Sequence, residues 1–449
     1  MKSRVKFQNL IWLASLLTVA SCATHPDNIA RIDSAAQDGY FEEVLTQIDG
    51  ERNRRRRRGS VWNDPRNDIL FYLDRGMIAH YAGLYWESFQ ALQRAEQLIE
   101  EAFTRSLTQD IGALLLNDNV REYRGENYED LYINVFNALN LHFLGNLEGA
   151  LVEIRRLNEK LNLLADRYER VARRVLDSDP NLEPMHIPME ASRFSNSALA
   201  RYLGILFYRA AGNIDGVRIE HEELIRAFEL APDVYTHPIP TSVSDELSVP
   251  AGMARLNIIA FTGLSPFKQE EHIIVPLPFP PPNHSARIAL PVLIERPQAI
   301  NHVEVRLSSG QRFALELLED MGAVAKETFR STYSLTVLRS TARAVTRATA
   351  AGVGAQVAAD RGGEGMGILV GLLGRVFVEA AERADTRISR FFPARALVGG
   401  INLEPGFYTV MINFYGPSGL VNSQFRDIEV RENTLNLKRF VWLKKFHCF

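Results

Sequence analysis

The hydrophobic pattern of this chain changes its period once, and this change constrains the fold more than any other feature of the sequence. From residue 28 to 236 the apolar residues recur at the spacing of an α-helix. After residue 250 they alternate with polar residues in several short runs, as in β-strands. These runs include Val303, Val305 and Leu307, and Tyr408, Val410, Ile412 and Phe414. We therefore predict a two-domain α+β protein, with a helical domain at 28–236, a proline-rich linker at 237–250 and a β-sandwich-like domain at 251–449.

Three stretches of the helical domain carry small residues and glycines at the spacing of helical hairpins. They are Gly76, Gly83, Ser88 and Leu92; Ala138, Gly145, Ala150 and Ile154; and Gly204, Gly212, Val217 and Leu224, with a shortened copy at Gly39, Val44 and Ile48. Small residues let two helices approach, and glycine accepts the positive φ of a tight turn. We expect an irregular TPR-like array with extra helices between the copies, which lie 62 and 67 residues apart. A non-repetitive helical bundle is the alternative.

A stretch with a helical pattern, residues 320–386, interrupts the β region and is rich in Ala, Gly and Thr. We expect an inserted helical hairpin whose arms meet at small residues such as Gly352 and Gly367. Its second arm is apolar for about nine residues before Arg375, and a transmembrane helix needs roughly 20. Two interpretations stay open: the apolar face with Leu369 and Leu373 contacts a partner or a membrane, or the hairpin covers its own domain.

The N-terminus has the features of a secretory leader. Lys2, Arg4 and Lys6 precede an apolar stretch, Leu10 to Ala20, that is too short to span a bilayer. The next residues, Val19-Ala20-Ser21-Cys22, resemble the lipobox of bacterial lipoproteins, in which the cysteine thiol receives diacylglycerol and becomes the mature N-terminus. We predict a signal peptide at 1–21, a lipidated Cys22 and a tether at 22–27. An ordinary secretory signal with an incidental cysteine is the alternative.

The residues after Cys22 bear on where the protein is sorted. Ala23 and Thr24 include no aspartate at the second position, which resembles the outer-membrane sorting class in a Gram-negative host. We expect a cell-envelope protein that is attached to the outer membrane by its lipid and faces the periplasm. Because the acylated Cys22 would leave Cys448 without a partner, we expect no intrachain disulfide.

The charge of the chain argues against nucleic acid as a partner. The formal net charge is −3, and loss of the leader would make it −6. One basic run stands out against this balance: Arg52, Arg54, Arg55, Arg56, Arg57 and Arg58. It is either a solvated loop between helices or a contact with an anionic surface, such as lipid phosphates or an acidic cell-wall polymer.

No catalytic or metal-binding motif is found in the sequence. None of the ten histidines lies in an H-E-x-x-H pattern, and no G-x-S-x-G or S-x-x-K motif occurs. The glycines at 365, 367 and 371 lack the lysine of a phosphate-binding loop. We therefore predict no metal, no cofactor and no enzymatic activity. Lys268 and Glu270, which follow Gly263 and Pro266, are equally consistent with a structural salt bridge and a binding site.

Three segments resemble an uncharacterised family of bacterial envelope lipoproteins with a TPR-like N-terminal half and a β-rich C-terminal half. They are Tyr123 to Arg156 with Gly125 and Tyr128-Glu129; Gly263 to Glu270, which is similar to G-x-x-P-x-K-x-E; and Ala384 to Arg387 with Phe392-Pro393, which is similar to ADxR…LP. The resemblance makes Lys268, Glu270, Asp385 and Arg387 candidate site residues. Ser389 stands where the family pattern has Trp, and Phe392 where it has Leu.

Together these features predict a lipid-anchored periplasmic scaffold whose helical groove binds another envelope protein. A structural subunit of an oligomeric envelope complex, built as a homo-oligomer, is the second hypothesis. An enzyme that acts on peptidoglycan is the third.

The lipid anchor can be tested directly. Replacing Cys22 by Ala should abolish the incorporation of labelled fatty acid and leave an unprocessed precursor, because the thiol that accepts diacylglycerol is gone. Radiolabelled palmitate and a size comparison on a gel measure both effects. Normal labelling and processing of this variant would show that Cys22 is not the anchor.

Overall fold

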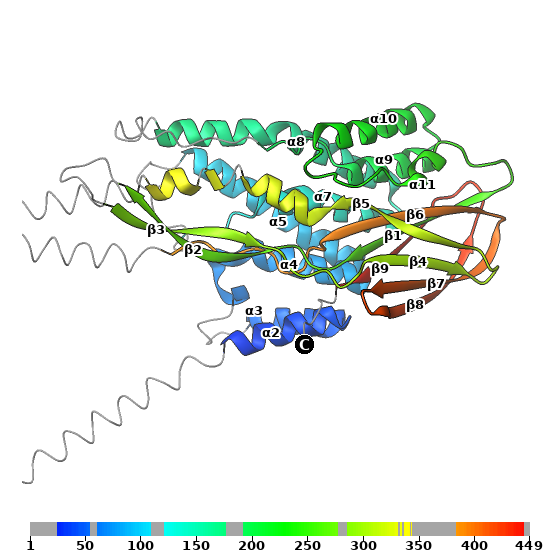
Figure 1. Ribbon diagram of the computed structural model, residues 1–449, viewed down its shortest axis with the longest axis horizontal. Helices are drawn as coiled ribbons and strands as arrows, with labels where there is room; N and C mark the ends of the chain where they lie inside the picture. The colour runs from blue at the N-terminus through cyan, green and yellow to red at the C-terminus, as the bar shows by residue number, and fades with distance from the viewer. Residues whose placement is uncertain are drawn as a thin grey trace, which may run out of the picture.

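The protein is mixed α+β, with helices in the N-terminal half and a strongly curved sheet in the C-terminal half (Figure 1). The computed structural model describes residues 25–53, 61–108, 121–176, 192–276, 285–330, 333–334, 336–341, 343 and 383–443. The helices are α2 (His25–Gln37), α3 (Phe41–Asn53), η1 (Val61–Asn63), η2 (Pro65–Asn67), α4 (Asp68–Ala82), α5 (Tyr85–Thr108), α7 (Asn127–Phe143), α8 (Leu147–Leu176), α9 (Ala198–Ala210), α10 (Ile214–Leu230) and α11 (Thr241–Asp245). The predicted linker at 237–250 therefore contains the short helix α11.

Consecutive helices pair as hairpins, α2 with α3, α4 with α5, α7 with α8 and α9 with α10. The turns of these hairpins contain Gly39, Gly83, Gly145 and Gly212, with φ of 87°, 80°, 80° and 70°. The prediction that glycines occupy these turns is confirmed, because only glycine adopts this conformation without strain. Within the described residues, the length of two helices accounts for part of the wide spacing between copies: α5 has 24 residues and α8 has 30.

Gly76, where α4 crosses α5, shows why small residues recur within the hairpins. A Cβ at Gly76 would lie 2.6 Å from Cγ of Leu92, so α4 and α5 are packed too closely for any side chain there. The Ser88 hydroxyl donates to the Gly76 carbonyl at 2.8 Å, which fixes the same crossing. In the next hairpin the fully buried Ala138 and Ala150 are the small residues.

The C-terminal half is built on one seven-stranded sheet, in the order β8-β7-β4-β5-β6-β1-β9, and a separate two-stranded ribbon, β2-β3. The strands are β1 (Ala254–Thr262), β2 (Phe267–Pro276), β3 (Ser285–Ile294), β4 (His302–Leu307), β5 (Arg312–Asp320), β6 (Arg395–Leu403), β7 (Gly406–Gly416), β8 (Gly419–Val430) and β9 (Asn436–Trp442). Only the parallel pair β1-β9 departs from antiparallel pairing in the larger sheet.

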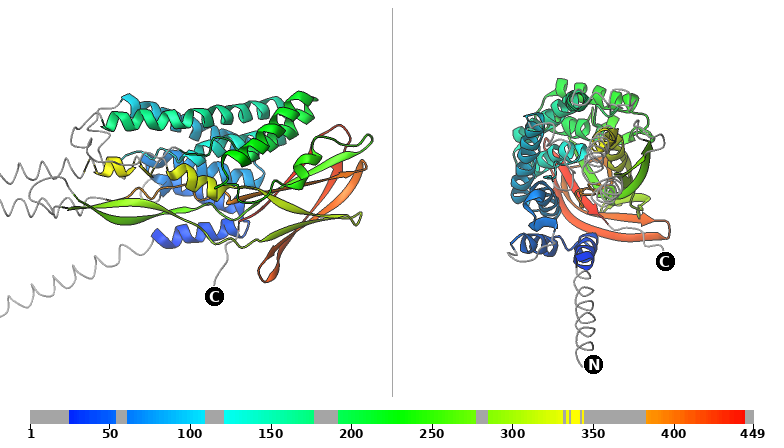
Figure 2. Two further views of the ribbon diagram at one scale, coloured as in Figure 1. Left: turned by 45° about the horizontal axis from the view of Figure 1, so that its top comes forward. Right: turned by 90° about the vertical axis from the view of Figure 1, so that its left-hand side faces the viewer.

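The predicted β-sandwich is wrong, because the sheet curls on itself instead of packing against a second sheet (Figure 2). Its concave face encloses its own apolar side chains, among them Ile258, Val305 and Ile412. A register shift at Leu317/Glu319 in the β5-β6 pair and the small Gly399 and Gly400 in β6 permit the curvature. The two edge strands approach each other, since Gln424 Nε2 of β8 donates to the Val441 carbonyl of β9 at 2.9 Å.

Strand β1 is buried along its whole length. Leu256 and Ile258 point into the concave core, whereas Ile259 and Phe261 point to the helices. The helix-facing side belongs to one continuous apolar core that includes α4, α7 and α9. The two halves of the chain therefore share a core across the 237–250 segment.

The predicted insertion lies between the neighbouring strands β5 and β6. Residues 321–330 are helical, as expected, and Met321, Val324 and Ala325 join the core shared with the helices. This part of the insertion covers its own fold. Residues 383–386, in contrast, are irregular and not helical, and Gly352, Gly367, Leu369 and Leu373 lie outside the described residues. Within the described part of the chain, no helix is both long and apolar enough to cross a membrane.

The close α4-α5 crossing makes a prediction about stability. Gly76→Ala should lower the free energy of unfolding by about 1–3 kcal/mol, because the new methyl group overlaps Leu92. Gly50→Ala in α3 is the matched control: a Cβ there meets nothing within 4 Å, so this variant should gain about 0.5–1 kcal/mol from helix propensity. Chemical denaturation measures the free energy of unfolding of both variants and of the parent. Equal stability would contradict the tight crossing.

Candidate functional site

The three segments that carry the family resemblance meet at one place in the fold. The first, residues 123–156, begins in the stretch that leads into α7. The second, residues 263–270, connects β1 to β2. The third, residues 384–387 with 392–393, lies in the stretch 384–394 that runs into β6 and is called the strap below. The Ser265 amide donates to the Phe392 carbonyl at 2.9 Å, and the Phe392 ring makes an edge contact with the Tyr128 ring at 5.8 Å. We call this meeting point the motif junction.

Lys268 and Glu270 hold the second segment to the other two. The Lys268 ammonium forms a buried ion pair with Glu126. Burial lowers the pKa of Lys268, but the carboxylates of Glu126 and Asp385 outweigh this effect and raise it above its usual value. Glu270 Oε2 accepts a hydrogen bond from the Ala384 amide at 2.7 Å. Both residues therefore have partners within the chain.

Asp385 and Arg387 form the other half of the junction. The guanidinium of Arg387 bonds both oxygens of Asp385, at 2.8 and 2.7 Å, and its third nitrogen donates to Asn67 Oδ1 at 3.0 Å. It also lies 5.5 Å above the Tyr123 ring. The structure thus brings all four predicted residues together, and their contacts join the strap and β2 to the helices.

Two buried carboxylates, which the sequence did not mark as candidate site residues, bind the strap. The Ser389 amide donates to Glu129 Oε1 at 2.6 Å, and the Ser389 hydroxyl donates to Asp74 Oδ1 at 2.7 Å. The amide of Arg390 donates to the same Asp74 oxygen at 2.8 Å. An acidic residue inside an apolar helical run, as in Leu73-Asp74, is the signal that could have identified them.

Burial controls the charge of both carboxylates. It raises the pKa of Asp74 to about 6, although hydrogen bonds from Arg390, Trp62 and Ser389 oppose it. Burial, together with the nearby carboxylate of Glu126, raises the pKa of Glu129 to about 8. Glu129 is therefore largely neutral at pH 7, and it can retain its hydrogen bonds there without a full buried charge.

The arginine run is only partly described. Arg52, its first residue, pairs with Asp68 at 2.8 Å and donates to the Trp62 carbonyl at 3.1 Å, so it links α3 to the start of α4. Arg54, Arg55, Arg56, Arg57 and Arg58 lie outside the described residues, as does Cys22. The contact of the run with an anionic surface stays a prediction.

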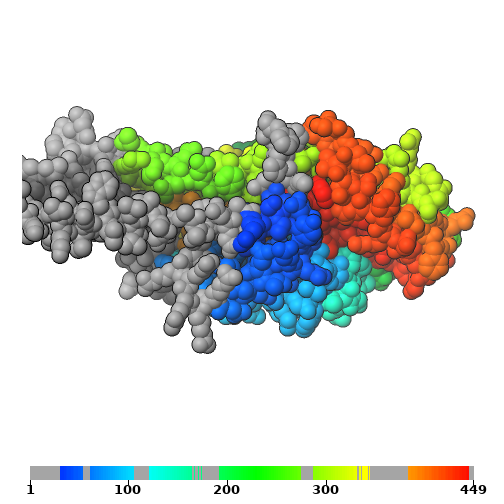
Figure 3. Space-filling view, turned by 90° about the horizontal axis from the view of Figure 1, so that it is seen from below, coloured from blue at the N-terminus to red at the C-terminus, as the bar shows by residue number. Residues whose placement is uncertain are grey.

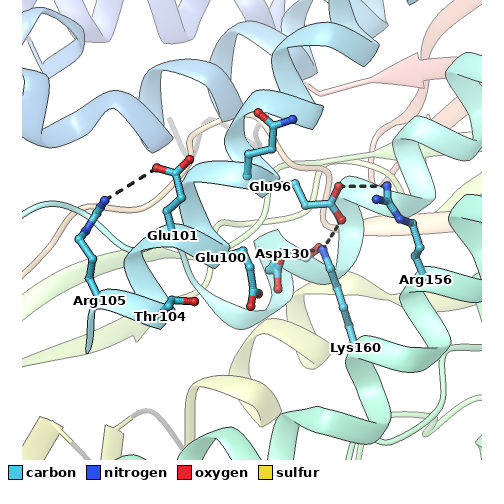
Figure 4. Close-up of a pocket in the computed structure, with 9 residues that line it drawn as sticks. Glu96, Glu100, Glu101, Thr104, Arg105, Asp130, Arg156 and Lys160 are labelled. Atoms are coloured by element: carbon cyan, nitrogen blue, oxygen red, sulfur yellow. Dashed lines mark hydrogen bonds and ion pairs between the residues drawn. The ribbon is translucent and has the colours of Figure 1, made fainter. Parts of the chain in front are cut away.

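A separate hollow lies on the helical side, between α5, α7 and α8 (Figure 4). Its volume is about 640 Å³. It is lined by Glu96, Gln97, Glu100, Glu101, Thr104, Arg105, Asp130, Arg156 and Lys160. We call it the helical groove. All of its lining side chains are polar or charged, with both signs of charge present.

An ion-pair network forms the floor of the helical groove. The Lys160 ammonium lies 2.5 Å from Asp130 Oδ1 and 2.8 Å from Glu96 Oε1. Arg156 reaches the other oxygen of Glu96 at 3.4 Å. Burial raises the pKa of Glu96, but the Lys160 charge and hydrogen bond reverse this and hold it below its usual value. A carboxylate held in this way is a weak general base.

The rim of the helical groove is more exposed than its floor. Glu101 and Arg105 face each other there at 3.8 Å, and Arg105 also pairs with Glu122 at 2.6 Å. Exposed ion pairs of this kind contribute little to stability, so their charges can be exchanged for contacts with a ligand at low cost. In the described parts of the chain, no cluster of three His, Cys, Asp or Glu side chains could hold a metal ion.

The burial of Glu129 predicts a pH dependence. Its folded pKa of about 8 lies above the ordinary value of 4.5, so the folded protein binds more protons between these pH values. The contribution of this group to stability is therefore full below about pH 4.5 and is lost as the pH rises to about 8. Glu129→Gln, which cannot ionise, should remove this part of the pH slope.

Urea denaturation at pH 5, 7 and 9 measures the effect. The stability difference between the parent and Glu129→Gln should move in favour of the variant as the pH rises, by up to a few kcal/mol in order of magnitude. Glu404→Gln, at an exposed site between β6 and β7, is the control and should follow the parent. Parallel pH profiles for all three proteins would show that Glu129 is not a buried titrating group.

The comparison with known proteins adds no relative. No protein-family model, no curated protein and no solved structure matches this chain. The function must therefore be argued from the motif junction and the helical groove themselves.

Proposed function

We propose that the protein is a lipid-anchored scaffold of the cell envelope that binds another protein in its helical groove. The observation that carries the proposal is the groove itself: a hollow of about 640 Å³ lined by charged side chains of both signs from three helices. Charged rims of this kind select a partner by complementary charge and do not require chemistry at the site.

The repeated helical hairpins support our proposal that the helical half is an irregular TPR-like array. Its hairpins repeat the same turn glycine, and Gly76 and Leu92 in one copy correspond in spacing to Ala138 and Ile154 in the next. Stacked hairpins form extended surfaces that bind partners along the array. The helical groove lies where two of these hairpins, α4-α5 and α7-α8, meet.

The electrostatics of the groove favour binding over catalysis. Burial lowers the pKa of Lys160, but Asp130 and Glu96 outweigh it and raise it, so the amine stays protonated at neutral pH and is not a nucleophile. Neither carboxylate on the floor is available as a base while it holds this ammonium. The arrangement keeps the walls of the groove rigid and leaves the rim to make contacts.

The location proposed for this scaffold is the periplasmic side of the outer membrane. It rests on the lipobox-like sequence that ends at Cys22, since each buried CH₂ of an acyl chain contributes about 0.8 kcal/mol and two or three chains hold a protein at a membrane. A partner at the helical groove would then be another protein of the envelope.

Site-specific crosslinking in cells tests the groove. A photoreactive amino acid at position 97, in the groove, should form one dominant crosslink to an envelope protein, whereas the same group at position 218, on α10 outside the groove, should not. Identification by mass spectrometry names the partner. Equal products from both positions, or none from position 97, would contradict the proposal.

A charge reversal sharpens this test. Glu101→Lys should reduce the crosslink from position 97 several-fold, because it places a like charge beside Arg105 at the rim. Glu222→Lys, an equally simple reversal on α10, should leave it unchanged. Both variants should keep the melting temperature of the parent, since both sites are exposed.

A further inference from the structure

The outer face of the β7-β8 hairpin exposes large aromatic side chains. Along β7, Val410, Ile412 and Phe414 point into the concave core, so the alternate residues point outward. Phe407, on this outer side, is 83% exposed. Phe425 of β8, which pairs with the outward Met411, is 66% exposed. Phe407 lies opposite Glu429 and Phe425 opposite Met411, so the two rings share one face but are four positions apart along it.

The two carboxylates of this face each have a partner within the chain. Asp427 accepts a hydrogen bond from the Thr409 hydroxyl at 2.6 Å, and Glu429 pairs with Arg431 at 2.5 Å. Arg431 compensates the charge of Glu429, whereas Asp427 keeps its negative charge with a hydroxyl as donor. Such carboxylates can contact hydrated headgroups but are costly to bury among acyl chains. The outer face of β7-β8 is therefore suited to a partly apolar, partly hydrated surface.

The same side of the molecule carries the N-terminal helices. Figure 3 shows α2 and α3, in blue, beside the β7-β8 region, in orange to red, on one face. The turn between α2 and α3 exposes Tyr40, at 62%. Cys22 precedes the first residue of α2, His25, by three positions, which is a reach of about 10 Å. A lipid on Cys22 would thus place a membrane close to this face.

We propose that Phe407, Phe425 and Tyr40 dock this face onto the lipid headgroup region of the membrane that holds the anchor. The inference rests on the proposed lipid anchor and adds an orientation to it. Tyr favours the boundary between headgroups and acyl chains, and exposed Phe side chains add apolar surface that can enter it. With the face against the bilayer, α8 lies on the other side of the helical array, away from α2 (Figure 1). Arg156 and Lys160 of α8 line the helical groove.

The acylated mature protein, reconstituted in vesicles of phosphatidylethanolamine and phosphatidylglycerol, tests this orientation. In a Cys448→Ser background, Phe407→Cys carries an environment-sensitive fluorophore. Ile214→Cys is the matched control, since Ile214 is also a large apolar residue, 81% exposed, but lies at the start of α10 on the opposite side. The label at 407 should shift to shorter wavelength and be quenched by brominated lipids, and the label at 214 should do neither.

A second substitution separates docking from mere proximity. Phe425→Ser, added to the protein labelled at 407, should reduce the lipid quenching several-fold, whereas Ile219→Ser on α10 should leave it unchanged. Both residues are exposed, so an unchanged melting temperature shows that the fold is intact. Equal quenching in the two doubly substituted proteins would overturn the role of the aromatic face.

Vesicle flotation distinguishes failure of this inference from failure of the anchor. If the protein floats with the vesicles while the labels at 407 and 214 both report water, the docking face is wrong and the lipid anchor is still supported. Protein that does not float overturns both. A label at 407 that is shielded without lipid quenching, together with a larger particle in size-exclusion chromatography, would assign the face to a second copy of the chain and overturn the lipid contact.

Discussion

The need to cover both faces of one sheet governs the whole structure. Strand β1 is buried at every position, so its apolar residues on one side must meet the helices and those on the other must meet the sheet itself. Curling of the sheet satisfies the second requirement, and stacking of α4, α7 and α9 against it satisfies the first. The helical half and the sheet are consequently tied through one core and could not separate without exposing it.

Polar groups inside this interface are tolerated because each buried carboxylate has several donors. Glu319, which the β5 register shift turns toward the helices, accepts from Tyr132, Ser197, Tyr235 and the Leu199 amide at 2.6–3.1 Å. Burial raises its pKa above the usual value, against these hydrogen bonds. Asp74 and Glu129 hold the strap by the same means. Such satisfied networks fix one arrangement of the two halves, since a shifted register would leave a carboxylate unpaired.

How much of the fold and of the candidate site could be predicted from the sequence depends on how far apart in the sequence the interacting residues lie. The turn glycines, such as Gly83 and Gly145, could be identified because positive φ is a local requirement. The strands containing Val305 and Val410 could be identified from their alternation. The sandwich prediction failed because curvature depends on features of paired strands, such as the β5-β6 bulge. Asp74 and Ser389 are in contact although they lie 315 positions apart in the sequence. The local sequence indicates this contact only through an acidic residue within an apolar helix.

At the motif junction, the four candidate residues taken from the family resemblance already have partners within the chain. Lys268, Glu270, Asp385 and Arg387 do converge, as a binding site would require, but Glu126, the Ala384 amide, Asn67 and Tyr123 occupy their charges and hydrogen bonds. A ligand there would have to displace contacts that hold the helices on the sheet. A ligand at the rim of the helical groove would instead displace exposed ion pairs, which do not hold the helices on the sheet. This difference in cost supports our proposal that a partner binds at the groove, whereas the contacts of the motif junction join the strap and β2 to the helices.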